Sequence, residues 1–267
     1  MQGIDQEFPN VMCFSGLDPT GGAGLQADIE TLFSTGCHTL PVATAITVQN
    51  TQNASSITTI EPATIIEQAR AVLEDIPVQC FKVGLTGDVA IVEVIHTLLR
   101  DYPDVPVIVD PVMRAGGGFQ FGSREISDAI RSLLLPLTTV LTPNIEEIME
   151  LAPSADSVEA CANELLESGC QHILMSGTQA TTPDVVNKFF SPHAGLSLFT
   201  WPRLEHSYHG AGCTLAASLA GYLAHGLDLR DAIQQAQRFT WESLSHGTRI
   251  GFGQHIPNRS AWSKQGF

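Results

Sequence analysis

Short, nearly uninterrupted apolar runs alternate with segments of helical composition along most of this 267-residue chain. Of all the features of the sequence, this alternation restricts the possible folds the most. The apolar runs are VMCFSG, LPVATAITVQ, CFKVGL, VPVIVDPVM, TTVLTPN and HILMSGT. Strands that are apolar on both faces are typical of parallel sheets covered by helices on both sides. We therefore predict an α/β fold with three layers, in which a central, mainly parallel sheet lies between helices.

The segments between these runs give the expected helices and two further β-like patches. A helix is expected to end at Gly36, others to span about residues 63–74, 89–99 and 125–134, and two helices to close the chain. The patches are ASSITTIEP and VVNKFFSPHAGLSLFTWP, and the second predicts an antiparallel hairpin with its turn near residues 193–195. Because no repeat or Pro/Ser-rich linker divides the chain, we expect one domain over residues 1–267.

Charge and cysteine usage exclude several classes of protein. With 13 basic and 28 acidic residues the net charge is −15, and no Lys/Arg cluster indicates a nucleic-acid or anionic-membrane surface. The 6 cysteines lack CxxC spacing, so reduced thiols are expected. The first ten residues lack the pattern of a signal peptide, and no apolar run reaches the roughly 18 residues that span a membrane. A cytoplasmic protein is expected.

Polar, acidic or Gly-rich stretches follow each of the six apolar runs. In chain order they are SGLDPTGGAG, VQNTQN, GLTGD, DPVMRAGGG, TPNIEE and SGTQATT. In open parallel sheets, ligands bind outside the carboxyl ends of the strands. The sequence therefore predicts that one crevice gathers all six stretches.

The acidic residues in these stretches have a structural and a functional interpretation, and the sequence alone leaves both open. SGLDPTGGAGLQAD fits neither a dinucleotide fingerprint nor a Walker loop. Asp18 in this stretch is either an ordinary turn residue or a site residue. Asp28 lies within the predicted helix and is expected on its solvated face. Asp110, at a strand end, is a Mg²⁺ ligand or a turn residue. Asn144 and Glu147 lie on one face of a helical turn, as site residues or as a capping box.

The stretch YHGAGCT precedes an Ala/Leu-rich helical run and places Cys213 at the start of that helix. Gly210 and Gly212 indicate a tight turn whose free amides suit an anion. The helix dipole favours a thiolate, so we predict a lowered pKa for Cys213. His209 either pairs with this cysteine or caps a loop. The other five cysteines are expected to be small buried apolar residues.

The motifs SGLDPTGGAGLQADI, TAITVQNT, VDPVM, LTPNIEE and HGAGCTLAASLA, in this order, resemble the hydroxymethylpyrimidine/phosphomethylpyrimidine kinases of thiamine biosynthesis, which belong to the ribokinase-like superfamily. The resemblance extends over about residues 11–226. It implies a ribokinase-like three-layer sandwich that forms a homodimer and uses ATP and Mg²⁺. It also implies two successive phosphorylations, of the pyrimidine's hydroxymethyl group and then of the monophosphate.

The resemblance also assigns roles by matching positions. The pyrimidine pocket would be formed by Gly16, Asp28, Gln49, Leu85 and Val112. The anion hole would be formed by Gly210, Ala211 and Gly212, with Cys213 as the general base. Mg²⁺ and the ATP phosphates would be held by Asp110, Glu147, Asn144, Ser176 and Thr178.

Two stretches depart from the family pattern. Many members have Lys-Gly-Gly-His where this chain has SGTQ, so a phosphate-facing lysine is missing at Ser176, and Thr178 or Lys188 is a candidate to replace it. The stretch RAGGGFQFGS differs as well. Its Arg114 is either a contact for the substrate phosphate in the second step or an exposed loop arginine.

Three alternative functions remain. A pyridoxal/pyridoxine kinase on the same scaffold also acts on a hydroxymethyl heteroaromatic ring, although Gln49 and Cys213 favour the pyrimidine. A non-catalytic pyrimidine-binding protein would keep the fold and lose the chemistry. A cysteine hydrolase built on Cys213 and His209 lacks a third residue that would orient the pair.

Overall fold

The computed structural model describes residues 8–177 and 182–261, and its centre is a sheet with strand order β3-β2-β1-β4-β5-β6-β7-β8-β9. The strands are β1 (Asn10–Leu17), β2 (His38–Gln49), β3 (Ala54–Thr59), β4 (Cys80–Val83), β5 (Val107–Val109), β6 (Val140–Leu141), β7 (His172–Met175), β8 (Asp184–Ser191) and β9 (Gly195–Pro202). Neighbours from β2 to β7 are parallel, whereas β3, β8 and β9 join antiparallel. This confirms the mainly parallel sheet and the antiparallel hairpin.

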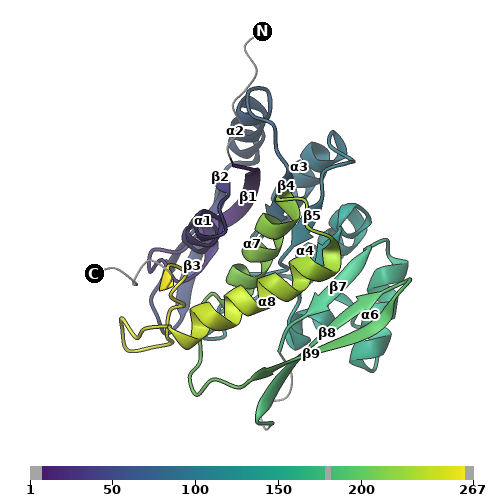
Figure 1. Cartoon of the computed structure of the whole chain (residues 1–267). Coiled ribbons are helices and arrows are strands. Elements are labelled where there is room, and N and C mark those ends of the chain that lie inside the picture. Colours follow the sequence, from purple (N-terminus) through teal and green to yellow (C-terminus); the bar gives the residue numbers. More distant parts are fainter. Residues whose placement is uncertain (1–7, 178–181, 262–267) are drawn as a thin grey trace.

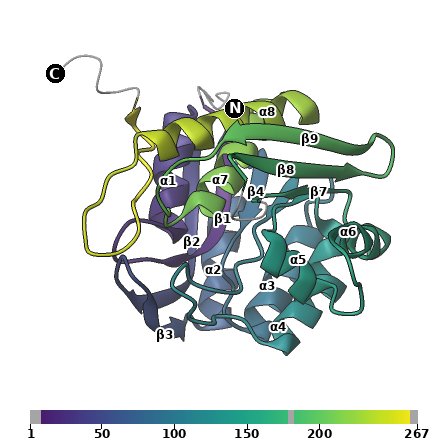
Figure 2. The same cartoon turned by 90° about the horizontal axis from the view of Figure 1, so that it is seen from below.

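Helices cover both faces of the sheet and complete the three layers (Figures 1 and 2). One face carries α1 (Gly24–Ser34), α7 (Ala211–Ala224) and α8 (Leu229–Ser245). The other carries α2 (Pro62–Leu73), α3 (Val89–Arg100), α4 (Arg124–Ala129), α5 (Ile145–Leu151) and α6 (Val158–Glu167). Each face has its own apolar core, because the central strands bury side chains on both sides. Among the described residues, no helix combines the length and the apolar character needed to cross a membrane.

The expected helix over residues 125–134 is only partly an α-helix. It starts as α4 and continues as a π-helical turn, η1 (Ile130–Leu134), and a 3₁₀ turn, η2 (Leu135–Leu137). Pro136 explains the change, because proline cannot donate to the carbonyl one turn earlier and its ring crowds that carbonyl.

The two helices expected to close the chain are α7 and α8, but the described residues continue beyond them. After α8, residues 246–261 fold back along the loops at the carboxyl ends of the strands. Bridges join Tyr208 to His255 and Thr248 to Ile256, and the amide of Gln254 donates to the Thr51 carbonyl at 2.8 Å. Composition gave no sign of this return, because the segment has neither helical nor strand periodicity.

Candidate active site

A cavity of about 310 Å³ opens at the carboxyl ends of the parallel strands. Its walls contain residues from all six of the stretches that follow the apolar runs, together with the turn before α7. The loops therefore meet in one crevice, as the position of these stretches predicted. Parallel strands explain the convergence, because their carboxyl ends lie at the same edge of the sheet.

Most of the residues singled out from the sequence line this cavity. They are Gly16, Gln49, Leu85, Asp110, Val112, Asn144, Glu147, Ser176, Gly210, Ala211, Gly212 and Cys213. Thr178 lies outside the described residues. Asp28 is the exception among the described ones, because it is absent from the cavity wall.

Asp28 is fully buried beneath the cavity, so its expected place on a solvated helix face is wrong. Its partner is Lys82 of β4, also fully buried, with Nζ 3.0 Å from Asp28 Oδ1. The same Nζ lies 4.0 Å from Oδ2 of Asp110 on the cavity wall. Burying an ammonium group requires such carboxylate partners. The signal that sequence reasoning missed was the lone lysine in the apolar run CFKVGL.

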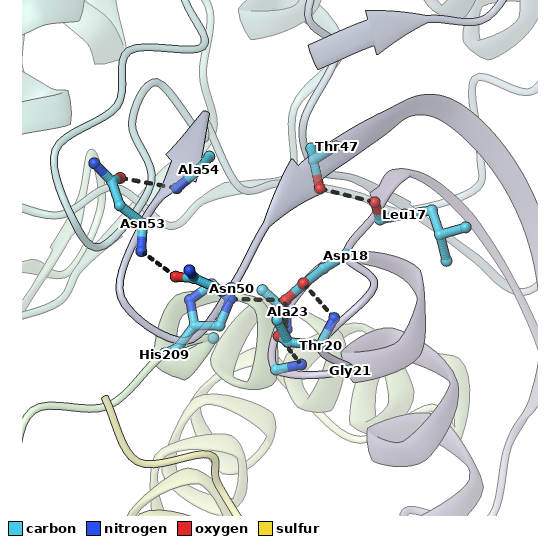
Figure 3. Close-up of polar contacts among 12 residues, drawn as sticks. Leu17, Asp18, Thr20, Gly21, Ala23, Thr47, Asn50, Asn53, Ala54 and His209 are labelled. Atoms are coloured by element: carbon cyan, nitrogen blue, oxygen red, sulfur yellow. Dashed lines mark hydrogen bonds and ion pairs between the residues drawn. The ribbon is translucent and has the colours of Figure 1, made fainter. Parts of the chain in front are cut away.

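Asp18 organises the first Gly-rich turn, as Figure 3 shows. Its carboxylate accepts hydrogen bonds from the Thr20 amide at 2.8 Å and the Ala23 amide at 2.9 Å. Nε2 of His209 lies 2.7 Å from its Oδ2. Burial raises the pKa of Asp18, but the hydrogen bonds from His209 and Thr20 outweigh burial and lower it to about 2. Asp18 is thus both a turn residue and part of the cavity wall.

His209 therefore joins the turn before α7 to the first Gly-rich turn. Among the described residues, no hydrogen bond connects it to Cys213. This arrangement removes the Cys–His pair on which the hydrolase alternative depends. It also explains the glycine at position 22, because a Cβ there would lie 2.3 Å from Cδ2 of His209.

The backbone at the start of α7 approaches the first turn closely. Gly210 has a φ of 82° in the left-handed region, and a Cβ on it would lie 1.8 Å from the Gly22 carbonyl oxygen. The first amides of a helix have no acceptor within the helix. Here those amides belong to residues on the cavity wall, Ala211, Gly212 and Cys213, so they are available to an anion.

Cys213 does not have the lowered pKa that its helix position predicts. Burial, and next the charge of Asp110, raise the pKa of this thiol. Only 9% of the residue is exposed, so loss of hydration outweighs the helix dipole. Burial also raises the pKa of the Asp110 carboxyl, and Lys82 and then the neighbouring Cys213 thiol lower it in part.

Asn144 and Glu147 form the capping box that was the structural interpretation of their spacing. Asn144 Oδ1 accepts from the Glu147 amide at 2.9 Å, and Glu147 Oε2 accepts from the Asn144 amide at 2.8 Å. Both residues also line the cavity, so the cap holds them beside Asp110. Burial raises the pKa of Glu147 to about 8, and the charge of Asp110 adds to this effect.

Asp110 and Glu147 fit a divalent cation. Oδ2 of Asp110 is buried without a hydrogen-bond partner, and two neighbouring carboxylates favour a positive charge between them. No group of three or more metal-binding side chains occurs in the described parts of the chain. The remaining ligands would thus be phosphate oxygens and water, which suits Mg²⁺.

A second cavity of about 250 Å³ lies between the β8–β9 hairpin, α7 and α8. Its walls include Trp201 and Trp241, and it shares Ser176, Ala211 and Gly212 with the first cavity. The two cavities therefore meet at the start of α7. Sequence reasoning missed this second cavity because its walls come from four separate segments.

Of the two candidate replacements for the missing lysine, the structure describes one. Thr178 falls outside the described residues. Lys188 lies on neither wall, and its Nζ contacts Oε1 of Glu159 at 2.6 Å instead. Among the described residues that line the first cavity, Arg114 is the only lysine or arginine.

The fold and this site define a class. An open α/β sheet, with a cavity at the carboxyl ends of its strands and a helix start that faces acidic strand ends, is the arrangement of the ribokinase-like kinases. The family model for phosphomethylpyrimidine kinase matches residues 18–258. The chain belongs to this family.

Relatives and solved structures agree with this assignment. The chain is 32% identical to the hydroxymethylpyrimidine/phosphomethylpyrimidine kinase of Escherichia coli, over 92% of this chain and 95% of that one. It is also 35% identical to the thiamine biosynthesis bifunctional protein ThiED of Geobacter sulfurreducens, over 92% of this chain and 51% of that one. The chain therefore spans about half the length of the bifunctional relatives that it matches.

Two solved structures show the same fold. The ADP complex of Bacillus subtilis pyridoxal kinase matches 96% of this chain and 99% of its own, at 25% identity and a TM-score of 0.87. The phosphomethylpyrimidine kinase of Clostridium difficile matches 87% of this chain and 97% of its own, at 29% identity and a TM-score of 0.74.

Proposed function

We propose that this chain transfers the γ-phosphoryl group of ATP to the hydroxymethyl group of 4-amino-5-hydroxymethyl-2-methylpyrimidine, and then to the resulting monophosphate. The family assignment supports kinase chemistry on such pyrimidines. The observation that carries the proposal is the junction of the two cavities at the start of α7. A ring in the first cavity and a nucleotide in the second would place acceptor and donor on either side of free helix amides.

In the first cavity, Gln49 offers an amide that pairs with ring nitrogen and amino groups, and Leu85 and Val112 supply apolar walls. Cys213 lies where it can receive the alcohol's proton at Sγ. The thiol lies beside the Asp110 carboxylate, so the sulfur accepts the alcohol proton as its own proton moves to one oxygen of that carboxylate, and the other oxygen stays available to Mg²⁺. The alcohol oxygen then forms the bond to phosphorus and the bond to the ADP oxygen breaks.

ATP phosphates would lie against Asn144 and Ser176, with Thr178 as an expected further contact. Asp110 and Glu147 would hold Mg²⁺, which would supply charge neutralisation for the phosphates. The helix amides of Ala211 and Gly212 would stabilise the migrating phosphoryl group. ATP use also agrees with solved pyridoxal kinases in complex with AMP-PCP.

A pyridoxal kinase is the second candidate, because pyridoxal kinases of Bacillus subtilis and Staphylococcus aureus match the fold with TM-scores of 0.87. Gln49 and Cys213 favour the pyrimidine. Comparing kcat/KM for the pyrimidine and for pyridoxal measures the preference directly.

A phosphorus NMR time course with ATP, Mg²⁺ and the hydroxymethylpyrimidine tests the proposal. Successive monophosphate and diphosphate signals are expected. A monophosphate that accumulates without diphosphate would limit the chain to the first step. The absence of pyrimidine-dependent ATP consumption would contradict the kinase assignment and favour a non-catalytic binding protein.

Arg114 is proposed as the contact for the substrate phosphate in the second step. In the ligand-free protein its guanidinium faces Glu146 at 3.7 Å and Glu150 at 3.6 Å. The pairs are long and its side chain is 47% exposed, so they hold it weakly. A phosphate monoester offers a stronger, bidentate partner.

In Arg114→Ala we expect kcat/KM to fall about tenfold for the monophosphate, since an exposed charged contact contributes about 1.4 kcal/mol at most, and to change little for the alcohol. Initial rates with each substrate measure this. The control is Arg124→Ala, a more exposed arginine on α4 that lies off the cavity wall. Unaltered second-step kinetics in Arg114→Ala would remove this role.

A homodimer and a cytoplasmic location remain predictions. For the dimer, Leu17, Ile46 and Val48 leave apolar side chains exposed on neighbouring strands β1 and β2. Sedimentation equilibrium of the protein and of Val48→Asp tests whether this surface joins two copies. A monomer at micromolar concentration would contradict the homodimer.

A further inference from the structure

Arg259 is a buried charged residue, and along the sequence it lies far from every residue expected in the site. It comes from the segment that follows α8, and its side chain has no exposed surface. A buried guanidinium is costly unless its donors are paired. The groups that accept hydrogen bonds from this guanidinium therefore show what Arg259 does in the fold.

The guanidinium connects three separate parts of the chain. Nη2 donates to the Gly22 carbonyl and Nη1 to the Gly21 carbonyl at 3.4 Å, both in the first Gly-rich turn. Nε donates to Oγ1 of Thr214 in the first turn of α7 at 3.0 Å. Nη1 also pairs with Glu30 of α1 at 3.0 Å. Arginine suits this task because its donors form a rigid planar fork.

The two turns that Arg259 joins are the ones that meet at the cavity. They touch at Gly210 and Gly22, where the missing Cβ of Gly210 would be 1.8 Å from a carbonyl oxygen and 2.9 Å from Nη2 of Arg259. His209 and Asp18 join the same turns and line the cavity. Arg259 lines the neighbouring groove and not the cavity, so it does not face the substrate.

We propose that Arg259 is a positioning residue for phosphoryl transfer: it holds the first Gly-rich turn and the start of α7 at the separation at which the α7 amides face the migrating phosphoryl group. The inference rests on the proposed function. Small displacements of such donors affect the rate more than ground-state binding, because charge on the phosphoryl group must be met in the transition state. Its loss therefore lowers kcat more than it raises KM.

The test compares Arg259→Met, which keeps the length of the side chain without donors, with Arg259→Lys, which keeps the charge but not the fork. The matched control is Arg238→Met, an exposed arginine on α8 that pairs with Glu242 within the same helix. All are assayed below their melting temperatures, with kcat and KM measured separately for the pyrimidine and for ATP.

We expect kcat to fall about 100-fold in Arg259→Met and less in Arg259→Lys, with each KM changed by less than about threefold, while Arg238→Met matches the parent. Hydrogen exchange at the amides of residues 20–24 and 210–214 should be at least about tenfold faster in Arg259→Met. This second measurement needs no catalysis. It therefore tests whether Arg259 holds the two turns together even if the parent lacks pyrimidine kinase activity.

Unchanged exchange at both turns would overturn the proposal. So would a parent-like kcat in folded Arg259→Met, or a loss that appears in KM alone. If Arg259→Met does not fold, the same comparison in Arg259→Lys decides, with the same two criteria.

Discussion

Cys213 is subject to two opposing effects, a helix N-terminus that favours a thiolate and a buried setting beside Asp110 that disfavours it. Burial raises the pKa of Cys213, so the free protein holds a neutral thiol beside the Asp110 carboxylate. A general base of this kind accepts a proton only as it releases one. It suits phosphoryl transfer, in which positioning and charge stabilisation supply most of the rate.

Replacing Cys213 by alanine removes the proposed proton acceptor. We expect kcat to fall about 100-fold, the lower range for general acid–base catalysis, with the KM for ATP nearly unchanged. Steady-state kinetics measure both. Cys161→Ala, which removes a buried thiol of α6, is the matched control and should lower the melting temperature without lowering kcat. A parent-like turnover in Cys213→Ala would contradict the proposed mechanism.

Asp18 gives the fold an acid-sensitive contact. Its pKa is lowered from 3.8 to about 2, so the ionised form stabilises the native state above the unfolded pKa. That contribution, about 2 kcal/mol, is lost as pH falls from about 4 through about 2. In Asp18→Asn we expect a lower free energy of unfolding at pH 7 and a shallower decline between pH 4 and 2.

Urea denaturation at several pH values measures this dependence. Asp75→Asn, which changes an exposed carboxylate, corrects for the removal of one charge. A decline in Asp18→Asn as steep as in the parent would mean that the contact with His209 does not stabilise the fold. No kinetic measurement is needed, so the result is independent of the proposed activity.

At the scale of elements, the position of α7 is fixed by its N-cap residue, Gly210. Gly210 has a left-handed backbone, and the space where a Cβ would lie is filled by the first Gly-rich turn. At the other end of α7, Gly226 has a φ of 80° but no atom within 4 Å of its missing Cβ. The two glycines share the backbone conformation and differ only in what surrounds them.

Alanine at these two positions separates conformational strain from crowding. Gly226→Ala should cost about 1 kcal/mol of unfolding free energy and leave kcat unchanged. Gly210→Ala should cost about 3 kcal/mol or more, because the two turns must also separate, and should lower kcat. Chemical denaturation and steady-state kinetics measure the difference. Equal losses of stability would show that the turns move apart freely.

Elements were predictable where a local pattern determines them. Apolar runs located the parallel strands, and the position of polar stretches after them located the cavity. Contacts between segments distant in sequence were not predictable. Nothing local indicates that Lys82 pairs with Asp28, that His209 reaches Asp18, or that Arg259 returns to the first turn. The pKa of Cys213 was mispredicted for the same reason, since its burial depends on the whole fold.

At the scale of the molecule, the two cavities divide the proposed work. The first is lined by loops of the parallel sheet, whereas the second is lined by the antiparallel hairpin, α7 and α8. Figure 2 shows that hairpin, β8 and β9, beside β7 at one edge of the sheet. The start of α7 belongs to both. A nucleotide in the second cavity would therefore order the amides that the substrate in the first cavity needs.

The aromatic wall of the second cavity makes nucleotide binding visible. The rings of Trp201 and Trp241 stack with centroids 6.3 Å apart, and both line this cavity. We expect a non-hydrolysable ATP analogue with Mg²⁺ to change their fluorescence. At a concentration 100 times its Kd it should add about 2.7 kcal/mol to the free energy of unfolding. The background for the measurement is Trp262→Phe, because that tryptophan lies outside the described residues.

The hydroxymethylpyrimidine alone provides the comparison, since it should raise the melting temperature without a comparable change in fluorescence. Because α7 joins the two cavities, we expect each ligand to tighten the binding of the other by the same factor, as thermodynamic linkage requires. Calorimetric titration of one ligand in the presence of the other measures that factor. If the nucleotide stabilises the protein without any change in fluorescence, it binds away from the two tryptophans and outside the second cavity. The wall that the two cavities share would then not couple the two ligands.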